Sequence, residues 1–494
     1  MKAFLIFVSC LLWASPGWAN DLYQEHCAEC HHPKRLGAMG PALLPENLER
    51  VPKKESAEVI AKGRPATQMP AFGDKLTEEQ IQEMVSYIYA PMTPAPVWSE
   101  GDMKDNHLTW LANDKLPKQP VHKADPLNLF MVVELGDHHV TVLDGDRFEP
   151  IDRFPSRFAL HGGIKYSPEG RFAYMASRDG WISRFDLYSL KMTHEIRVGI
   201  NTRNVAVSGD GRYVMAANTL PRNLVILDAR DLSLVKTLPL VNAKGESSRP
   251  SAVYAAPPRN SFIVALKDIP EVWEIPVATK EGRPVQNFEV RAIGLSAVLD
   301  DFLFDQAYKR LIGASRKGPT GQVVDLDAGQ KIADVELTGM PHLASGIIWP
   351  YQDTEVMVTP NLKEGEVTVV DMKSWKVIKR IPTLGPGFFM RSHENSPYAW
   401  VDVFSGKDKD AVHVLDKRRL EIVKTLRPEP GKTSAHVEFT KDGRFALLSI
   451  WEIEGALVIY DAKTLEEVKR IPMMKPSGKY NVSNKINRSA GTSH

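Results

Sequence analysis

A repeat that recurs eight times from about residue 98 onward constrains the fold of this chain most strongly. In each copy an apolar run ends in an acidic residue, and a short turn leads into a second apolar or basic stretch. The acidic markers are Asp144, Asp186, Asp228, Glu274, Asp325, Asp371, Asp416 and Asp461, at spacings of 42, 42, 46, 51, 46, 45 and 45 residues. A period of this length, made of short strands, is typical of a four-stranded propeller blade. An irregular β-sandwich does not generate eight spaced repeats, so the sequence predicts an all-β, eight-bladed propeller.

A second signature indicates tight turns between the strands of some blades. Three copies contain an acidic residue, a glycine and an arginine before an aromatic residue, beginning at Glu169, Asp210 and Asp442. An acidic residue followed by glycine favours a turn between short antiparallel strands. We therefore expect a strand on each side of these three positions.

The N-terminus has the pattern of a secretory signal peptide. An apolar run from Ala3 to Ala14 follows Lys2, and small residues lead up to a cleavage site after Ala19. A membrane anchor is the alternative, but the run is shorter than the roughly 20 residues that a spanning helix needs. No later segment is apolar for long enough to span, so we expect export to the periplasm or the outside.

The charge balance excludes one class of partner. The chain holds 62 Lys and Arg against 61 Asp and Glu, and removal of residues 1–19, which contain only Lys2, leaves 61 against 61. A neutral chain without a run of Lys and Arg lacks the surface that neutralises phosphates in nucleic-acid binding. We expect no nucleic-acid partner.

Two cysteines remain after cleavage, because Cys10 leaves with the signal peptide. They are Cys27 and Cys30, and His31 follows them directly in the sequence CAECH. In an exported protein, CxxCH is the attachment site of a c-type haem, in which the two thiols bind the porphyrin and the imidazole becomes an axial iron ligand. A redox pair or a small disulfide loop is the alternative. The pattern predicts one covalent haem c with His31 as an iron ligand.

A second axial ligand is expected within the next sixty residues. Met69 precedes a proline in the sequence TQMPAF, and ligation by methionine and histidine raises the haem potential, which suits an electron acceptor. Met39 and Met92 are rival ligands. A loop or core methionine is the alternative for Met69 itself.

A helix and a proline-rich stretch complete the predicted cytochrome. Thr77 and Gln80 form a capping-box signal for a helix that runs to Tyr89. Three prolines at positions 91, 94 and 96 then end the domain. We expect a signal peptide over 1–19, a small all-α cytochrome c domain over 20–92, a linker and the start of the propeller over 93–125, and the propeller over 126–494.

Four basic residues occupy corresponding places in the repeats. His161, Arg203 and His342 each stand seventeen residues after a marker, and His436 stands twenty residues after one. The innermost strand of a blade begins soon after the preceding marker, so we expect these side chains near one mouth of the central channel. A lone histidine there is more often a packed core residue, whereas three histidines and an arginine at equivalent places indicate a ligand site.

An exported cytochrome c fused to such a propeller resembles the cytochrome cd1 nitrite reductase family over nearly the whole mature chain. The resemblance is carried by residues 158–161 (FALH), 177–179 (SRD), 338–342 (TGMPH) and 475–482 (KPSGKYNV). In that family the propeller holds a non-covalent haem d1. The resemblance implies that His161 is the proximal ligand of the d1 iron. It also implies that Arg178, Arg203 and Arg249 hold the carboxylates of the macrocycle, a role that suits the guanidinium fork.

The departures from the family pattern concern the reaction. The family's nitrite reductases place two histidines over the distal face. His342 matches one, but residues 298–301 read VLDD where the other is expected. Tyr480 stands where the reductases have phenylalanine, and the cytochrome portion is shorter. These changes are similar to those of biosynthetic relatives that oxidise a propionate of dihydro-haem d1 to an acrylate, the last step of haem d1 synthesis for denitrification.

This resemblance implies roles for the residues and partners for the protein. Tyr480 and His436 are the expected acid/base pair, electrons pass to haem c, and His342 ligates or positions the substrate iron. Free tyrosine titrates near 10, so a histidine or an arginine must assist it; a packing role is the alternative for Tyr480. The expected partners are dihydro-haem d1 as substrate, a periplasmic electron acceptor and a transient complex with cytochrome cd1 nitrite reductase.

Two other functions stay open at this point. One is a working nitrite reductase with a single distal histidine, which predicts nitrite turnover and permanently bound haem d1. The other is a non-catalytic haem d1 carrier, which predicts tight binding without oxidation. The covalent haem argues against a carrier, because transport needs no electron acceptor.

Overall fold

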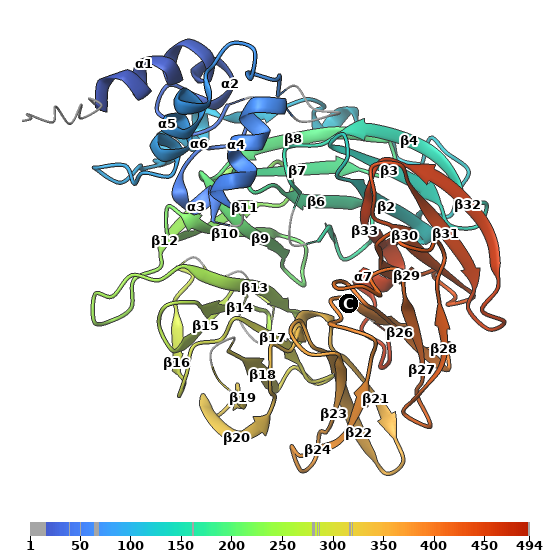
Figure 1. Ribbon diagram of the computed structural model, residues 1–494. Helices are drawn as coiled ribbons and strands as arrows, with labels where there is room; N and C mark the ends of the chain where they lie inside the picture. Colours follow the sequence, from blue (N-terminus) through green and yellow to red (C-terminus); the bar gives the residue numbers. More distant parts are fainter. Residues whose placement is uncertain are drawn as a thin grey trace, which may run out of the picture. The chain divides into compact units, whose positions relative to one another are not determined.

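The chain divides into two compact units, Met1–Pro96 and Val97–His494 (Figure 1). The computed structural model describes residues 16–38, 40–49, 51–63, 69–160, 163–278, 282–283, 285, 287–315, 318 and 320–492. Of the predicted signal peptide, residues 1–15 lie outside these ranges. None of the helices in the described ranges is long and apolar enough to cross a membrane.

The first unit is all-α, as predicted. Its helices are α1 (Pro16–His26), α2 (Ala28–His31), α3 (Pro45–Leu48), α4 (Lys53–Lys62) and α5 (Glu78–Ile88). Helix α5 begins where the capping box predicts it, because the Gln80 N–H donates to Thr77 Oγ1 and the Thr77 N–H donates to Gln80 Oε1. Its buried face joins the apolar core of this unit, which includes Tyr23, Phe72, Ile81, Met84, Val85 and Ile88.

The second unit is an eight-bladed propeller, which confirms the fold predicted from the repeat (Figure 1). Seven sheets have four antiparallel strands, and β1 extends the eighth to five. In seven blades the chain runs from the innermost strand outward. In the remaining blade the C-terminal strand β33 supplies the innermost strand by pairing with β2, so the two ends of the unit close the ring within one sheet.

The blades contain the following strands in chain order. The first two sheets are β2 (Leu129–Glu134), β3 (His139–Asp144) and β4 (Glu149–Pro155) with β33 (Pro476–Asn481), then β5 (Lys165–Tyr166), β6 (Phe172–Ala176), β7 (Trp181–Asp186) and β8 (Lys191–Arg197) with β1 (His107–Thr109). The next three are β9 (Asn201–Val207), β10 (Tyr213–Leu220), β11 (Asn223–Asp228) and β12 (Leu234–Pro239), then β13 (Pro250–Ala256), β14 (Ser261–Leu266), β15 (Glu271–Pro276) and β16 (Arg291–Gly294), then β17 (Asp301–Phe304), β18 (Arg310–Ala314), β19 (Thr320–Asp325) and β20 (Gln330–Glu336). The last three are β21 (Ile347–Tyr351), β22 (Thr354–Pro360), β23 (Glu366–Asp371) and β24 (Val377–Pro382), then β25 (Met390–Ser392), β26 (Tyr398–Asp402), β27 (Val412–Asp416) and β28 (Glu421–Leu426), then β29 (Ser434–Phe439), β30 (Phe445–Ile450), β31 (Gly455–Asp461) and β32 (Glu467–Met473). Two short α-helices, α6 (Glu100–Asp105) and α7 (Val482–Ile486), flank the strands in the chain.

Most acidic markers are turn residues between the third and the outermost strand of a blade. Oδ1 of Asp325 accepts hydrogen bonds from the backbone N–H groups of Asp327 (2.9 Å) and Ala328 (2.8 Å). Asp416 and Asp461 satisfy the N–H groups of their turns in the same way. A short acidic side chain that pairs with the turn backbone explains why an acid recurs at this place.

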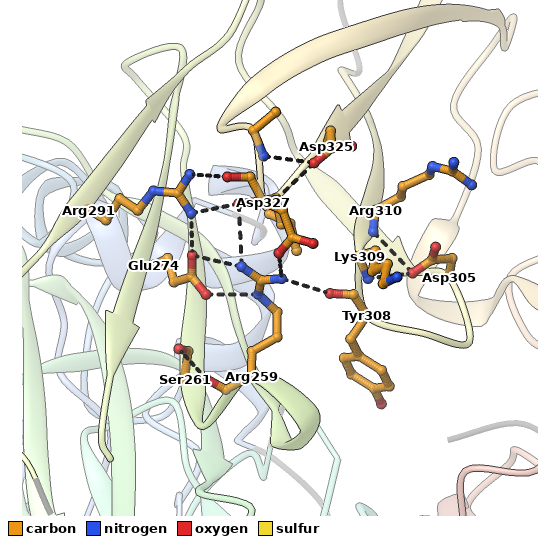
Figure 2. Close-up of polar contacts among 12 residues, drawn as sticks. Arg259, Ser261, Glu274, Arg291, Asp305, Tyr308, Lys309, Arg310, Asp325 and Asp327 are labelled. Carbon is orange, nitrogen blue, oxygen red and sulfur yellow. Dashed lines mark hydrogen bonds and ion pairs between the residues drawn. The ribbon is translucent and has the colours of Figure 1, made fainter. Parts of the chain in front are cut away.

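Glu274 does not occupy the equivalent place, so its assignment as a marker is wrong. It lies inside β15, and its carboxylate accepts hydrogen bonds from Arg259 Nε at 2.8 Å and Arg291 Nη1 at 2.9 Å (Figure 2). Arg259 also donates to Asp327 Oδ1 in the turn of the next blade, at 2.6 Å. Glu274 therefore joins two neighbouring blades instead of forming a turn, which explains the irregular spacings of 46 and 51 residues on either side of it.

The acid–glycine turns lie where the sequence predicts them, between the first and second strands of three blades. Gly170 connects β5 to β6, Gly211 connects β9 to β10, and Gly443 connects β29 to β30. Their φ angles are +79°, +70° and +73°. Glycine adopts this left-handed conformation without the steric cost that a Cβ atom brings.

The innermost strands of the eight blades surround the axis of the ring (Figure 1). Neighbouring inner strands such as β25 and β29, or β29 and β33, contact each other. Apolar clusters of buried residues fill the space between the blades. Side chains of inner strands from different blades, far apart in the sequence, are thereby brought together near the axis.

Candidate active site

His31, at the end of α2, is buried and held by a hydrogen bond to the backbone. The residue is 7% exposed, and its Nδ1 donates to the carbonyl oxygen of Pro41 at 2.7 Å. Because this bond fixes the proton on Nδ1, Nε2 keeps its lone pair for a metal. Burial lowers the pKa of the imidazole, which favours the same neutral form. Gly40 lies against the ring, where a Cβ atom would come within 2.7 Å of His31 Cε1.

The other residues predicted to hold haem c lie in the same helical unit as His31. Cys27 precedes α2 as its N-cap residue, and Cys27 and Cys30 are half-buried free thiols. Burial raises the pKa of the Cys27 thiol to about 11. Met69 packs against the apolar cluster that Cys27 also contacts, whereas the rival ligand Met39 lies outside the described residues. Two thiols, a buried neutral imidazole and a thioether within one small helical unit fit a covalent haem c.

His342 is held on the axial side of the propeller by a backbone acceptor and a carboxylate. Its Nδ1 donates to the carbonyl oxygen of Phe388 at 2.5 Å, and its Nε2 lies 3.9 Å from Asp301 Oδ2. Burial lowers the pKa of the imidazole, although Asp301 opposes this shift. Asp301 belongs to the VLDD stretch in which a second distal histidine is absent, so the chain places a carboxylate beside the histidine that remains.

His436 lies on the inner strand β29 in a strained backbone conformation. Its φ is +59°, and the pairing of β29 with β30 shifts register around it. Its ring stacks on Phe389 with centroids 3.6 Å apart and an interplanar angle of 29°. Burial, with the positive charges of Lys479 and Arg391, lowers the pKa of His436 well below its ordinary value. The imidazole is therefore neutral at neutral pH.

The ring of Tyr480, on the innermost strand β33, lies close to two glycines, Gly478 and Gly163. A Cβ atom on Gly478 would lie 2.2 Å from Tyr480 Oη, and one on Gly163 would lie 3.1 Å from Tyr480 Cε1. Gly163 comes two residues after His161 in the sequence. Burial raises the pKa of Tyr480 to about 12, although Arg391 opposes this shift. The hydroxyl is therefore protonated at neutral pH.

Two basic side chains, Lys479 and Arg391, lie within electrostatic reach of these residues. Lys479 is 3% exposed, and its Nζ has no hydrogen-bond partner among the residues that the structure describes. Burial lowers the pKa of this amine well below its ordinary value. The guanidinium of Arg391, on β25, lowers the pKa values of His342, His436 and Lys479, so it lies within electrostatic reach of all three. We refer to His342, Arg391, His436, Lys479 and Tyr480 as the axial cluster.

The remaining predicted site residues differ in their relation to the axial cluster. Arg203 contributes to lowering the pKa of His342, and its Nε donates to the Ser251 carbonyl oxygen at 2.7 Å. The backbone N–H of Arg178 donates to the carbonyl oxygen of Ala159, two residues before His161. The guanidinium of Arg249 instead pairs with both carboxylate oxygens of Asp268, at 3.0 and 2.7 Å. His161 itself lies outside the described residues.

The sequence analysis missed Arg391, Lys479 and Asp301. Arg391 stands twenty residues after the marker Asp371, the same spacing as His436 has from its own marker. Extending that count to every blade would have found it. Lys479 lies in the stretch 475–482 that resembles the family, and Asp301 lies where the family has a histidine, but neither residue follows a spacing that would predict a role for it.

Family models match both units of the chain. Residues 124–485 match the family described as "Cytochrome D1 heme domain". Residues 19–88 match the family described as "Cytochrome C oxidase, cbb3-type, subunit III". The first match covers most of the propeller and the second most of the helical unit.

Two known relatives and one solved structure are similar over nearly the whole chain. The dihydro-heme d1 dehydrogenase of Pseudomonas aeruginosa is 55% identical over 480 residues, which cover 97% of this chain and 96% of that protein. The nitrite reductase of Stutzerimonas stutzeri is 25% identical over 95% of this chain and 93% of its own length. A solved structure, "Dihydro-heme d1 dehydrogenase NirN in complex with DHE", is 54% identical, covers 95% of this chain and 100% of its own, and superposes with a TM-score of 0.92.

Proposed function

The chain belongs to the cytochrome d1 haem-domain family, and we propose that within this family it is a dihydro-haem d1 dehydrogenase. The observation that carries this function is the 55% identity, over 97% of the chain, to a protein of that name. The solved structure with a TM-score of 0.92 carries the same name. The substrate is dihydro-haem d1 and the product is haem d1.

The reaction is a two-electron oxidation of a propionate side chain. Two C–H bonds of its CH2–CH2 unit break and one C=C bond forms, so two protons and two electrons leave the substrate. Acid/base groups of the protein and water take the protons. Covalent haem c, when bound through Cys27, Cys30 and His31, supplies a one-electron acceptor. Met69 is the proposed sixth ligand of its iron.

The axial cluster suits an anionic tetrapyrrole. Arg391 places positive charge next to the histidines. Burial disfavours the charged form of the Lys479 amine, and its Nζ, which has no hydrogen-bond partner among the described residues, would gain one and a counter-charge from a substrate carboxylate. Arg178 and Arg203 complete the proposed contacts to the carboxylates. Arg249 is a weaker member of this set, because Asp268 already occupies its guanidinium fork.

The pKa directions divide the acid/base work between His436 and Tyr480. A neutral imidazole can accept a proton, so His436 is the proposed base. A hydroxyl with a pKa of about 12 is a hydrogen-bond donor rather than a base, so Tyr480 is proposed to orient the substrate by donating a hydrogen bond. His342 positions or ligates the substrate iron through Nε2, and His161 is the proposed proximal ligand.

The place of the reaction and its partners extend this proposal. The signal-like N-terminus and the CxxCH motif support the periplasm as the location. Haem c must pass its electrons on, so a periplasmic electron acceptor is part of the cycle. A transient complex with cytochrome cd1 nitrite reductase would deliver the finished haem d1 to its user.

The test is an anaerobic mixture of the oxidised holoprotein with dihydro-haem d1, followed by its visible spectrum. We expect reduction of haem c and the appearance of haem d1. Since each product releases two electrons and one haem c takes one, about half a molecule of product forms per protein until an external oxidant such as ferricyanide is added. Binding without conversion would indicate a carrier, and nitrite turnover by the same holoprotein would indicate a reductase.

A pair of arginine variants tests how the substrate is held. Arg391→Gln removes a charge from the axial cluster and should weaken dihydro-haem d1 binding by roughly 10- to 100-fold, the loss typical of a charged hydrogen bond. Arg249→Gln removes a guanidinium that Asp268 already holds and should change the affinity by less than about threefold. Titration by visible absorbance measures both. Equal losses in the two variants would contradict the assignment.

A further inference from the structure

Asp402 links two segments of the axial region through one buried carboxylate. It is the last residue of β26 and is 0% exposed. Its Oδ1 accepts hydrogen bonds from the backbone N–H groups of Phe388 at 2.7 Å and Phe389 at 2.9 Å. Its Oδ2 accepts a longer one from the backbone N–H of His436, at 3.4 Å.

The two segments that Asp402 joins carry the contacts of both axial histidines. The ring of Phe389 stacks on the imidazole of His436, with centroids 3.6 Å apart. The carbonyl oxygen of Phe388 accepts the Nδ1 proton of His342 at 2.5 Å, and the two rings lie 4.4 Å apart. The carboxylate of Asp402 therefore binds the backbone N–H of His436 directly. It also binds the backbone N–H of Phe388, the residue whose carbonyl oxygen accepts the proton of His342.

The three groups come from consecutive blades. His342 precedes β21, Asp402 ends β26 in the next blade, and His436 lies on β29 in the blade after that. The backbone is irregular on both sides of Asp402, because β25 begins only at Met390 and the register of β29 shifts around His436. One backbone hydrogen bond, from the Asp402 N–H to the Phe389 carbonyl oxygen at 3.2 Å, holds the first segment. The carboxylate of Asp402 adds the bonds to the N–H groups of Phe388, Phe389 and His436.

We propose that Asp402 is a positioning residue for the dehydrogenation, which fixes His436 against Phe389 and fixes the carbonyl that orients His342. The inference rests on the proposed function, in which these histidines serve the reaction. Asp402 acts through them and touches no reacting atom.

Asp402→Asn is a sharp test because it keeps the volume of the side chain. A carboxylate offers two acceptor oxygens, whereas an amide offers one oxygen and an NH2 group. In either orientation of the amide, its NH2 group faces a backbone N–H group, either that of His436 or those of Phe388 and Phe389. Two donors then face each other and one hydrogen bond is lost. A displacement of the histidines by about 1 Å costs on the order of 10²-fold in rate. We expect the rate of dihydro-haem d1 oxidation to fall roughly 10- to 100-fold while the dissociation constant stays within about threefold.

A double-mutant cycle separates positioning from general damage. In a background that carries His342→Ala and His436→Ala, Asp402→Asn should slow the holoprotein by less than about twofold, because nothing remains to be positioned. Asp410→Asn is the matched control. It changes another buried carboxylate of the same blade, which accepts from the Gly431 N–H at 2.9 Å, and it should leave the rate unchanged.

Several results would overturn the inference. The first is an unchanged oxidation rate in Asp402→Asn. The second is a rate that falls as much from Asp402→Asn in the His342→Ala, His436→Ala background as it does in the wild type. The third is a normal oxidation rate in that background without the Asp402 substitution. If Asp402→Asn does not fold, Phe389→Leu removes the stacking on His436 from the other side and should also lower the rate without changing the affinity; a normal rate there would refute the positioning. The wild-type holoprotein is assayed first, so an inactive wild type reports failure of the proposed function and not of this inference.

Discussion

The Tyr480→Phe variant distinguishes a hydrogen-bonding hydroxyl from a tyrosinate base. Burial raises the pKa of Tyr480 to about 12. At pH 7 the ionised fraction is then on the order of 10⁻⁵, and ionisation costs about 7 kcal/mol at 1.36 kcal/mol per pH unit. A protonated hydroxyl that donates one hydrogen bond in the transition state contributes about 1 to 3 kcal/mol. Its removal should therefore slow oxidation roughly 5- to 150-fold.

The pH dependence of the single-turnover rate tests this reasoning. With a protonated hydroxyl, Tyr480→Phe lowers the rate by the same factor at every pH from 6 to 9, and substrate affinity stays unchanged. With a tyrosinate base, the wild-type rate would rise about tenfold per pH unit over this range and the variant would not follow it, which would refute the argument. Tyr174→Phe is the control, because the Tyr174 hydroxyl donates to the Ala229 carbonyl oxygen within the propeller at 2.8 Å.

Three further predictions follow from single contacts. Gly478→Ala should slow oxidation about as much as loss of the tyrosine hydroxyl, because the new Cβ would lie 2.2 Å from that oxygen; Gly294→Ala, where a Cβ meets nothing within 4 Å, is its control in the same spectral assay. Glu274→Gln should lower the free energy of unfolding in guanidinium by about 3 kcal/mol, because it leaves two arginines without their buried carboxylate, whereas Asp327→Asn, with a side chain 61% exposed, should cost less than about 1 kcal/mol. Burial raises the pKa of Asp402 to about 6 from 3.8, so its carboxyl should contribute up to about 3 kcal/mol of stability below pH 4 that is lost as the pH rises through 6; the difference in unfolding free energy between wild type and Asp402→Asn measures this.

The fold could be predicted because its repeat has a local cause. A carboxylate such as that of Asp325 accepts hydrogen bonds from the N–H groups of the turn within the next three residues. Such a blade can therefore be recognised from its own stretch of sequence. The capping box at Thr77 is local in the same sense. Glu274 misled the count because an acid in an interblade ion pair looks the same in the sequence as an acid in a turn.

The site could be predicted only in part, because most of its contacts join residues far apart in the chain. The motif around His31 is contiguous and needs no fold to be read. Arg391 becomes visible once the blades are aligned, since its spacing from a marker repeats that of His436. Asp402 has no such sign: its role depends on a contact with His436, 34 residues later, which only the packing of two blades creates.

The basic side chains of Lys479 and Arg391, which suit an anionic substrate, also affect the pKa of His436, the proposed base. Burial, with the charges of Lys479 and Arg391, lowers the pKa of His436 and so keeps its imidazole neutral, but it also makes the imidazole a weak proton acceptor. A carboxylate of dihydro-haem d1 that pairs with these cations would cancel much of their field. The part of the His436 shift that these charges cause would then be removed, so its basicity would increase when substrate is in place. Binding of the anionic macrocycle would therefore also increase the basicity of His436, the proposed base.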